Sequence, residues 1–345
     1  MTAPPSALTP SRATRLLTRC VWLYLFGVLV VTGLLLELAD EWWVASLILF
    51  GPRWIWAIPL GVLVPAAWHL RRRLLWPLGL TTPALLFLVN SFEIPSLAVL
   101  TRGDEHRDLR VMTYNIGGGH PDPASLAPLL EEIAPDVALF QECDALLTTA
   151  RSALEQRGWH IEIQWSSCIA SKYPIRKVDA RDPKDIWKMG GSGAIVRYEV
   201  ELPGLPINIV NVHLETVREG LAAVMSRAWR GAPELEANIQ QRDLESGLAH
   251  RWTERASGPL VVTGDFNMPL ESAIYQRHWS SFTNAFSEAG FGFGVTKATA
   301  LHGIRIDHVL LGPGWVCLDA WVGPDLGMDH RPMVTDLHWR GKSEE

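Results

Sequence analysis

The sequence predicts an α/β domain of mixed β-sheets that pack face to face with helices outside, preceded by three membrane-spanning helices. Three observations lead to this prediction. Long apolar runs crowd the first 100 residues, strand-like runs recur through the rest of the chain, and several of those strands follow one another without an intervening helix. A regular alternation of strands and helices would instead indicate a purely parallel sheet.

The three apolar runs cover residues 21–38, 54–70 and 74–92. Each is close to the length of about 20 residues that a helix needs to cross a bilayer core. A secretory signal peptide would show one such run and a cleavage site, and a buried helical hairpin is rarely so uniformly apolar. We therefore expect residues 1–100 to form a membrane region with three transmembrane helices.

Arginines predict the orientation of these helices. Three precede the first run and three separate the second from the third: Arg12, Arg15, Arg19, Arg71, Arg72 and Arg73. The loop between the first two runs carries Asp40 and Glu41 instead. Because Lys and Arg are enriched in cytoplasmic loops, we expect a multi-pass protein of the inner cell membrane, with everything after residue 100 in the periplasm.

Charge is divided unevenly between the two parts. Residues 1–100 contain 7 Lys and Arg against 4 Asp and Glu, a net charge of +3. The whole chain has a net charge of −6, so residues 101–345 carry −9. An acidic outer domain does not suit non-specific binding of long nucleic acids, which depends on basic surfaces. Only a local basic groove would be compatible with that role.

The four cysteines are Cys20, Cys143, Cys168 and Cys317. Cys20 lies at the edge of the first apolar run, and the other three are odd in number and lack a CxxC spacing. This pattern indicates neither a zinc site nor a disulfide framework. We expect small, buried, apolar side chains.

The outer domain is predicted to cover residues 101–345, opening with the polar linker 102–108. Strand-like runs are found at 109–116, 136–142, 193–200, 207–214, 259–266, 304–311 and 331–339. Residues 123–133 place Leu126, Leu129, Leu130 and Ile133 at helical spacing, and 232–255 is a long, charged, amphipathic helix.

Polar residues of catalytic type stand at the ends of six of these segments. They are Asn115, Glu142, His213, Asp265 with Asn267, Asp307 with His308, and Asp329 with His330. Each one alone is more often a turn, a cap or a bystander. Burying all of them without partners would be costly, so we expect them to converge at one rim of the sheets, around a cation and an anionic substrate.

Phosphoester hydrolysis suits this set. Glu142 and Asn115 offer the oxygen ligands that Mg²⁺ prefers. We expect His330 to act as general base, because the ordinary pKa of a histidine lies near the working pH, and Asp329 or Asp307 can hold its tautomer. Three further residues are assigned to the attacking water and the phosphoryl oxygens: Asp265, Asn267 and His213.

The order YNI, FQE, NVHL, GDFN, IDH and DHRP resembles the endonuclease/exonuclease/phosphatase superfamily, with its deoxyribonuclease-like fold, over roughly residues 108–340. The resemblance implies a four-layer α/β sandwich and cleavage of phosphodiesters or phosphomonoesters with a divalent cation, usually Mg²⁺, with Mn²⁺ as an alternative. It also implies that Asn115 and Glu142 are metal ligands. The implied catalytic set is His213, Asp265, Asn267, Asp307 and His330, with Asp329 as the partner of His330.

Three functions remain open. The first is a membrane-anchored phosphoesterase acting outside the cytoplasm on a lipid head group or another small phosphodiester, with the lipid bilayer as its partner and no protein partner expected. The second is a DNA or RNA endo- or exonuclease. The third is a catalytically inactive, membrane-tethered binding module, which the presence of Glu142, Asp265 and His330 disfavours.

Overall fold

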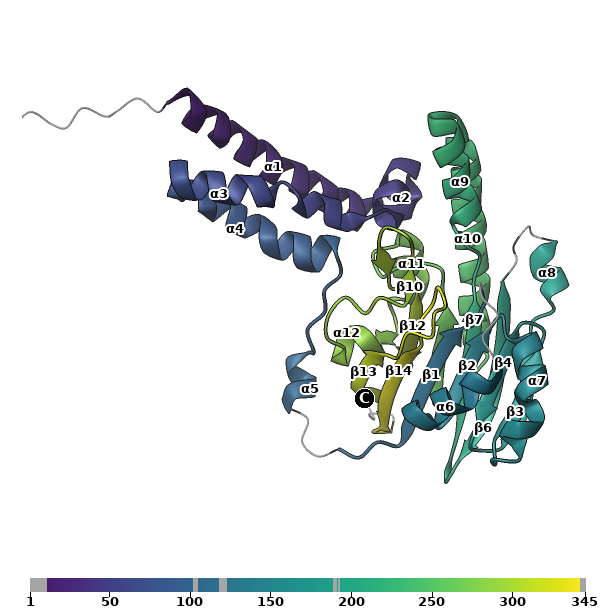
Figure 1. Cartoon of the computed structure of the whole chain (residues 1–345). Coiled ribbons are helices and arrows are strands. Elements are labelled where there is room, and N and C mark those ends of the chain that lie inside the picture. The colour runs from purple at the N-terminus through teal and green to yellow at the C-terminus, as the bar shows by residue number, and fades with distance from the viewer. Residues whose placement is uncertain (1–10, 102–104, 118–122, 189–190, 192, 342–345) are drawn as a thin grey trace, which may run out of the picture.

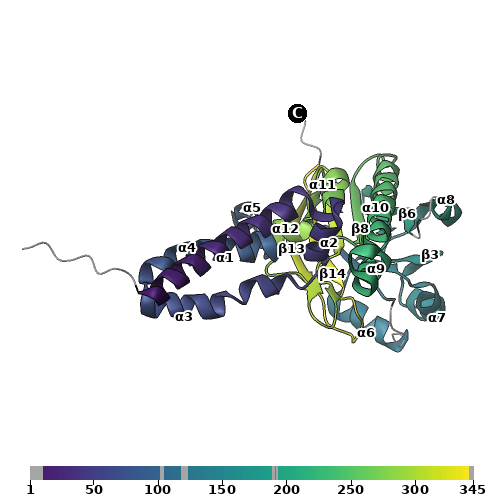
Figure 2. The same ribbon diagram turned by 90° about the horizontal axis from the view of Figure 1, so that it is seen from above.

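The computed structural model describes residues 11–341 except 102–104, 118–122, 189–190 and 192. A bundle of N-terminal helices projects from an α/β domain (Figure 1). Seen from above, the bundle extends away from one side of that domain (Figure 2).

The domain contains two six-stranded mixed sheets. The first has the strand order β13-β14-β1-β2-β4-β3, with bounds β1 Leu109–Asn115, β2 Val137–Gln141, β3 His160–Gln164, β4 Ser167–Ser171, β13 Trp315–Val322 and β14 Met333–Trp339. The second has the order β5-β6-β7-β8-β12-β9, with bounds β5 Ile175–Ala180, β6 Ala194–Leu202, β7 Leu205–His213, β8 Leu260–Asp265, β9 Thr283–Asn284 and β12 Asp307–Leu311. β1 with β2 and β7 with β8 pair in parallel, whereas the other pairs are antiparallel.

Helices and a short hairpin complete the domain. The helices are α5 Leu97–Thr101, α6 Pro123–Ile133, α7 Asp144–Glu155, α8 Pro183–Trp187, α9 Arg218–Arg227, η5 Ala228–Gly231, α10 Ala232–Thr253, α11 Ala273–Trp279 and α12 Ala285–Ala289, and the hairpin strands are β10 Lys297–Ala298 and β11 Gly303–Ile304.

The alternation of side chains along the strands produces four layers. Leu109 and Val111 of β1 face the second sheet and belong to the core between the sheets. Met112 and Tyr114 point to the opposite face, where they pack with residues of α6 and α7. On the far side, Val262 of β8 packs with residues of α10 and α11. The predicted packing of two mixed sheets flanked by helices is confirmed.

All seven predicted strand segments contain a strand, and both predicted helices form, as α6 and α10. Seven strands were missed: β3, β4, β5, β9, β10, β11 and β13. Three of these have only two residues, and β5 carries polar residues at three of the six positions in the sequence IRKVDA.

The prediction of three transmembrane helices is corrected. The N-terminal elements are α1 Arg12–Glu37, η1 Ala39–Glu41, α2 Trp43–Phe50, η2 Arg53–Ala57, α3 Leu60–Leu70, η3 Arg72–Leu74, α4 Leu75–Pro83 and the π-helix η4 Ala84–Val89. Among the described residues only α1 is long and apolar enough to cross a membrane; α2 with the helix Arg53–Leu70 would make a second if that pair, bent by 86°, counted as one span. Pro83 explains part of the difference, because α4 ends at this residue and the chain continues as the π-helix η4.

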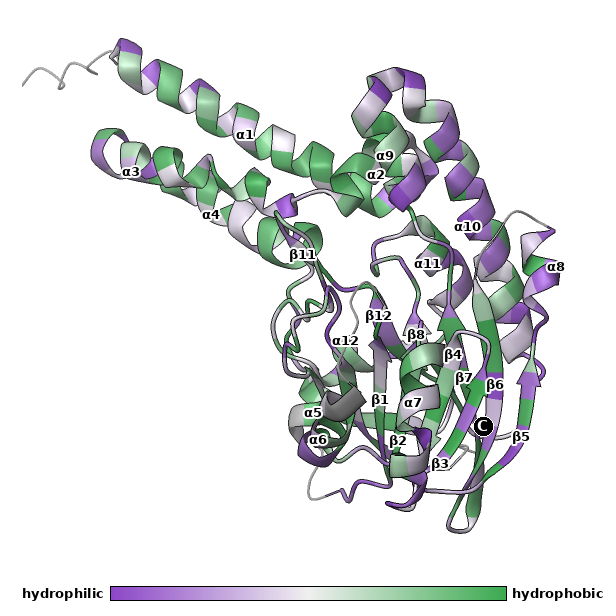
Figure 3. Ribbon diagram, turned by 45° about the vertical axis from the view of Figure 1, so that its right-hand side comes forward, coloured by the Kyte–Doolittle hydropathy of each residue, from purple (hydrophilic) through white to green (hydrophobic). Residues whose placement is uncertain are grey.

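The bundle is nevertheless rich in apolar residues, as the colours of α1, α3 and α4 in Figure 3 show. Large apolar side chains that are at least half exposed include Leu16, Trp22, Leu23, Phe26, Leu29, Val62, Trp68 and Trp76. The Arg71 guanidinium lies 3.4 Å from the Thr18 hydroxyl. The arginine triplet therefore lies beside the first turns of α1, at the end of the bundle away from the domain (Figure 1).

A buried polar network joins the bundle to the domain. Asp40, which is fully buried, accepts hydrogen bonds from the Ser272 hydroxyl at 2.7 Å and the Ala273 N–H at 2.8 Å, at the start of α11. The Arg242 guanidinium of α10 lies 3.3 Å from the same carboxylate. Asp40 therefore fixes η1 against two helices of the domain.

The expectation for the cysteines was wrong in one respect: Cys143 and Cys168 form a disulfide. The strand register explains it, because β2 and β4 pair Phe140 with Cys168 and bring the end of β2 beside β4. The sequence separation of 25 residues hides this proximity. Cys317 is buried, as predicted, with its Sγ 3.2 Å from the Asp319 carbonyl oxygen, and Cys20 is exposed.

Candidate active site

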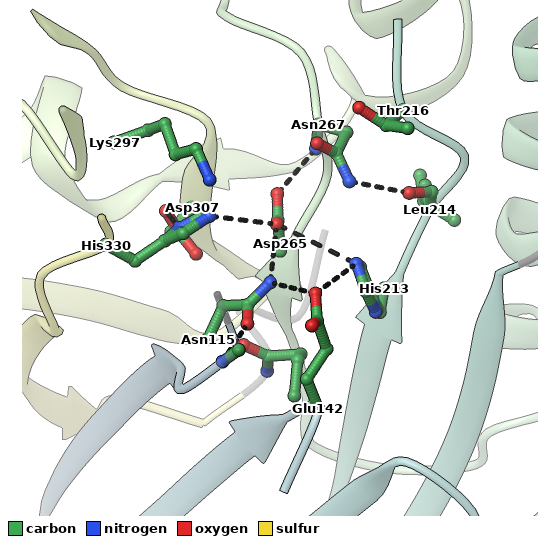
Figure 4. A network of polar contacts seen from close by, with 12 residues as sticks. Asn115, Glu142, His213, Leu214, Thr216, Asp265, Asn267, Lys297, Asp307 and His330 are labelled. Carbon is green, nitrogen blue, oxygen red and sulfur yellow. Dashed lines mark hydrogen bonds and ion pairs between the residues drawn. The ribbon is translucent and has the colours of Figure 1, made fainter. Parts of the chain in front are cut away.

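The ends of the central strands meet at one rim of the two sheets (Figure 4). β1 and β2 run in parallel and align Asn115 with Gln141, so the next residue, Glu142, lies beside Asn115. In the facing sheet, Asp265 aligns with both His213 and Asp307. The register of the strands thus brings five of the predicted site residues together.

Asp265 lies at the centre of the cluster. It is almost fully buried, and its carboxylate accepts hydrogen bonds from the Asn267 backbone N–H at 2.8 Å and the Asn115 amide at 3.0 Å. Burial and the neighbouring Asp307 raise its pKa. Gly264 before it has φ +140°, and a Cβ there would lie 1.9 Å from the Val212 carbonyl oxygen, so only glycine fits this approach of β8 to β7.

His330 is held between two carboxylates. Its Nδ1 lies 2.9 Å from Asp307 Oδ2, and its Nε2 lies 3.6 Å from Asp265 Oδ2. Burial opposes the charged form of His330, but Asp307 and Asp265 outweigh it and raise the pKa of His330 to about 9. Burial alone would raise the pKa of the Asp307 carboxyl. The charge of His330 and its hydrogen bond outweigh that effect and lower the pKa.

Asp329 is not the partner of His330, in contrast to the expectation. Its carboxylate forms an ion pair with Lys297 of β10, and Asp307 hydrogen-bonds His330 instead. The resemblance implied Asp329 for this role, whereas Asp307, the other candidate that the sequence left open, forms the hydrogen bond. Asp329 still lines the same cavity.

Asn115 and Glu142 lie on the opposite wall. The Asn115 amide nitrogen lies 3.2 Å from Glu142 Oε1, and its carbonyl oxygen accepts the Gly117 N–H at 2.9 Å. Glu142 has φ +53°, a strained conformation for a residue with a side chain. The Glu142 carboxylate is 45% exposed and lies 3.7 Å from the His213 Nε2.

These groups surround a cavity of about 300 Å³. Sequence reasoning missed three residues with polar or charged side chains that line it: Lys297, Thr216 and Arg218. Lys297 belongs to a two-residue strand, and the other two follow β7 in a loop and at the start of α9, so no periodic pattern marks them. His308, by contrast, does not line the cavity, and its Nε2 donates a hydrogen bond to the Met268 carbonyl, 2.9 Å away.

The oxygen-rich wall fits a divalent cation of the magnesium type. Asn115 and Glu142 supply an amide and a carboxylate oxygen, a donor set that matches Mg²⁺. Asp265, Asp307 and His330 also place ligand atoms within 4.8 Å of one another. Both nitrogens of His330 already face carboxylates, which suits proton transfer better than metal ligation.

A two-sheet sandwich with paired carboxylates, histidines and cavity-lining cations at its rim defines a phosphoric ester hydrolase. The chain belongs to the endonuclease/exonuclease/phosphatase family, whose pattern matches residues 112–336. No curated protein matches the sequence.

Solved structures share the fold. A humanized D. rerio TDP2 has a TM-score of 0.51 at 13% identity, over 67% of this chain and 98% of its own. An endonuclease/exonuclease/phosphatase from Beutenbergia cavernae has a TM-score of 0.51 at 17% identity, over 70% of this chain and 74% of its own. A variant of the 3′ phosphatase NExo from Neisseria, bound to product DNA hairpin, has a TM-score of 0.50 at 19% identity, over 67% of this chain and 100% of its own.

Proposed function

We propose that this protein is a membrane-anchored phosphodiesterase that hydrolyses a small phosphodiester or a lipid head group with Mg²⁺. The observation that carries the proposal is the convergence of Glu142, Asp265 and His330 on one polar cavity of about 300 Å³. Mn²⁺ is the alternative cation, because it also accepts carboxylate and amide oxygens.

The cation is assigned to Asn115 and Glu142. A bound divalent cation would polarise a phosphoryl oxygen and neutralise charge on the leaving oxygen. The Glu142 carboxylate is nearly half exposed and so open to both cation and substrate.

The protein's own groups would handle the water and the phosphate. His330 in its neutral form accepts a proton from the attacking water at Nε2, while Asp307 holds the Nδ1 proton and stabilises the resulting imidazolium. Asp265 and Asn267 orient the water. His213 and Lys297 face the cavity and can donate hydrogen bonds to the phosphoryl oxygens as negative charge develops there.

To test the substrate class, the full chain in detergent is assayed with Mg²⁺ on a panel of substrates. The panel contains bis-p-nitrophenyl phosphate, sphingomyelin, phosphoinositides, single-stranded and duplex DNA, and RNA. We expect turnover of the synthetic diester and of one lipid, with both lost in His330→Ala. Turnover of DNA or RNA alone would reject the small-diester assignment, and silence of the folded protein on the whole panel would favour the inactive binding module.

A nuclease is the second candidate. The structurally similar NExo is described with product DNA, and a D. rerio TDP2 of TM-score 0.51 is described with single-strand DNA product. Lys297 and Arg218 supply local positive charge at the cavity. Against it stands the charge of −9 after residue 100, which opposes long contacts with a nucleic acid backbone.

The proposed anchor is the N-terminal bundle. α1 has 26 residues and a length of about 39 Å at 1.5 Å per residue, enough for a bilayer core of about 30 Å. The exposed apolar side chains of α1, α3 and α4 would be costly in water and suit a bundle that lies in lipid, with α1 as the spanning helix.

The proposed side is the periplasm. The arginines beside the first turns of α1 favour a cytoplasmic location for that end of the bundle, and the Cys143–Cys168 disulfide favours an oxidising compartment for the domain. Alkaline phosphatase fused after residue 345 should be active, and a cytoplasmic reporter such as green fluorescent protein should be dark there. The reverse result would place the domain in the cytoplasm.

A further inference from the structure

Two histidines converge on one aspartate far from the candidate active site. His106 and Asp108 precede β1, and His338 lies in β14, near the end of the chain. The His106 Nε2 lies 2.9 Å from Asp108 Oδ1, and the His338 Nδ1 lies 2.6 Å from Asp108 Oδ2. The ligand atoms of the three residues all lie within 4.8 Å of one another.

The backbone fixes this arrangement. Asp108 donates its N–H to the Leu337 carbonyl at 2.9 Å, and its carboxylate accepts the Trp339 N–H at 2.8 Å. These bonds bracket His338 on both sides and hold the carboxylate beside it. An outer hydrogen bond of this kind orients a metal-ligating carboxylate.

The three side chains leave an open approach from solvent. His106 is 78% exposed, whereas Asp108 and His338 are only 26% and 17% exposed. Two imidazoles and a carboxylate match the three-ligand sites in which Zn²⁺ keeps a fourth position for water. Mg²⁺ prefers oxygen ligands, so the chemistry of the donors selects a transition metal.

We propose that His106, Asp108 and His338 form a site for Zn²⁺ or a similar divalent transition metal. The site is separate from the Asn115–Glu142 cluster, because the seven residues of β1 lie between them and span about 20 Å. Its metal would tie residues 105–108, which precede β1, to β14.

The geometry needs only a small adjustment to bind the metal. Zinc–ligand bonds of about 2.0–2.2 Å in a tetrahedral site place neighbouring ligand atoms about 3.3 Å apart. The two nitrogen–oxygen distances, 2.9 and 2.6 Å, are about 0.4 and 0.7 Å shorter than this, and the exposed His106 can move outward. Binding would replace a proton on each imidazole nitrogen that now faces the carboxylate.

Calorimetric titration of the full chain with Zn²⁺, in excess Mg²⁺, tests the proposal. We expect Glu142→Gln, which weakens the catalytic cation site, to retain one Zn²⁺ per chain. Adding His106→Ala or His338→Ala should weaken that binding at least about 100-fold, since even outer partners of metal ligands are worth about 10–100-fold. His160→Ala, at an exposed histidine of β3, is the matched control and should bind like its parent.

Replacing Zn²⁺ by Co²⁺ supplies a second readout, because imidazole ligation changes the visible absorption of Co²⁺. That change should appear in Glu142→Gln and vanish when His106→Ala is added. Because His106 is exposed, its replacement should not unfold the protein, so the loss would report on metal binding. Absence of Zn²⁺ binding in Glu142→Gln, or equal binding with and without His106, would overturn the proposal. Neither result would bear on hydrolysis, which depends on other residues.

Discussion

His330 illustrates how two carboxylates can set the protonation of one imidazole. Asp307 and Asp265 face its two nitrogens at 2.9 and 3.6 Å and raise its pKa to about 9 despite burial. As the proposed general base, His330 must be neutral to accept a proton, so below that pH most molecules would hold it in the inactive, protonated form. The rate of hydrolysis should therefore increase as the pH rises toward 9.

Asp307→Asn tests this coupling. Removing the nearer carboxylate lowers the pKa of His330, so the rising limb of the pH–rate profile should move to lower pH by about 1–3 units. The maximal rate should also fall, because the tautomer and the imidazolium lose support. A profile measured on bis-p-nitrophenyl phosphate that keeps the parent's midpoint would show that His330 is not the titrating base.

Lys297 places a positive charge at the candidate active site. Its ammonium group lines the cavity and pairs with Asp329, so Lys297→Ala should reduce kcat/KM about 10–100-fold through lost phosphate contacts. Steady-state kinetics would measure the effect. Lys188→Ala, at an exposed lysine after α8, is the control, and an equal effect of both substitutions would reject a local role for Lys297.

The sequence allowed most of the site residues to be predicted because a strand end is a readable feature. Asn115, Glu142, His213 and Asp265 all end or follow a recognisable strand. The partner of His330 could not be predicted, since Asp329 and Asp307 are equally acidic and only the fold distinguishes them. Lys297 lies in a segment without periodicity, and its role depends on long-range contacts alone.

At the scale of elements, Asp40 holds the bundle against the domain. Its buried carboxylate forms an ion pair with Arg242 and accepts hydrogen bonds from Ser272 and from the start of α11. Asp40→Ala would therefore leave the Arg242 charge buried without its ion-pair partner. The free energy of unfolding should fall by about 3–5 kcal/mol. Urea unfolding in detergent would measure the loss.

Glu41 is the matched control for Asp40. It is the next residue, but its ion pair with Arg277 is exposed, so Glu41→Ala should cost less than about 1 kcal/mol. Similar losses for Asp40→Ala and Glu41→Ala would mean that the buried network does not fasten η1 to the domain.

Helices and strands were predictable from the sequence where burial makes their apolar residues form a clear pattern. β1 and β2 have apolar residues on both faces because they lie between two packed layers, and they were identified without difficulty. The bundle was not, because apolar composition does not reveal where a helix ends, as α2 does at Phe50 and α4 does at Pro83. Composition predicts burial in lipid or protein, whereas the length of each helix depends on local backbone geometry.

At the scale of the molecule, the Cys143–Cys168 disulfide links the end of β2 to β4 across a sequence separation of 25 residues. Protein isolated from its native compartment should show a mass increase after reduction and alkylation at these two positions. The double variant Cys143→Ala/Cys168→Ala should lose about 2–4 kcal/mol in unfolding free energy. Cys20→Ser, at an exposed free thiol, should be neutral, and alkylation of both cysteines without reduction would contradict the bridge.

The proposed function makes the rim of the sandwich a Mg²⁺-dependent phosphodiesterase site. The most direct test measures hydrolysis of bis-p-nitrophenyl phosphate by the full chain while Mg²⁺ is titrated into chelator-treated protein, for the parent and for Glu142→Gln. We predict no turnover without the cation, saturation on its addition, and a Mg²⁺ requirement at least about 10-fold higher in Glu142→Gln, because the variant lacks the charged ligand. Turnover that persists in chelator would contradict a Mg²⁺-dependent reaction. An unchanged Mg²⁺ requirement in the variant would contradict the role of Glu142 as a metal ligand.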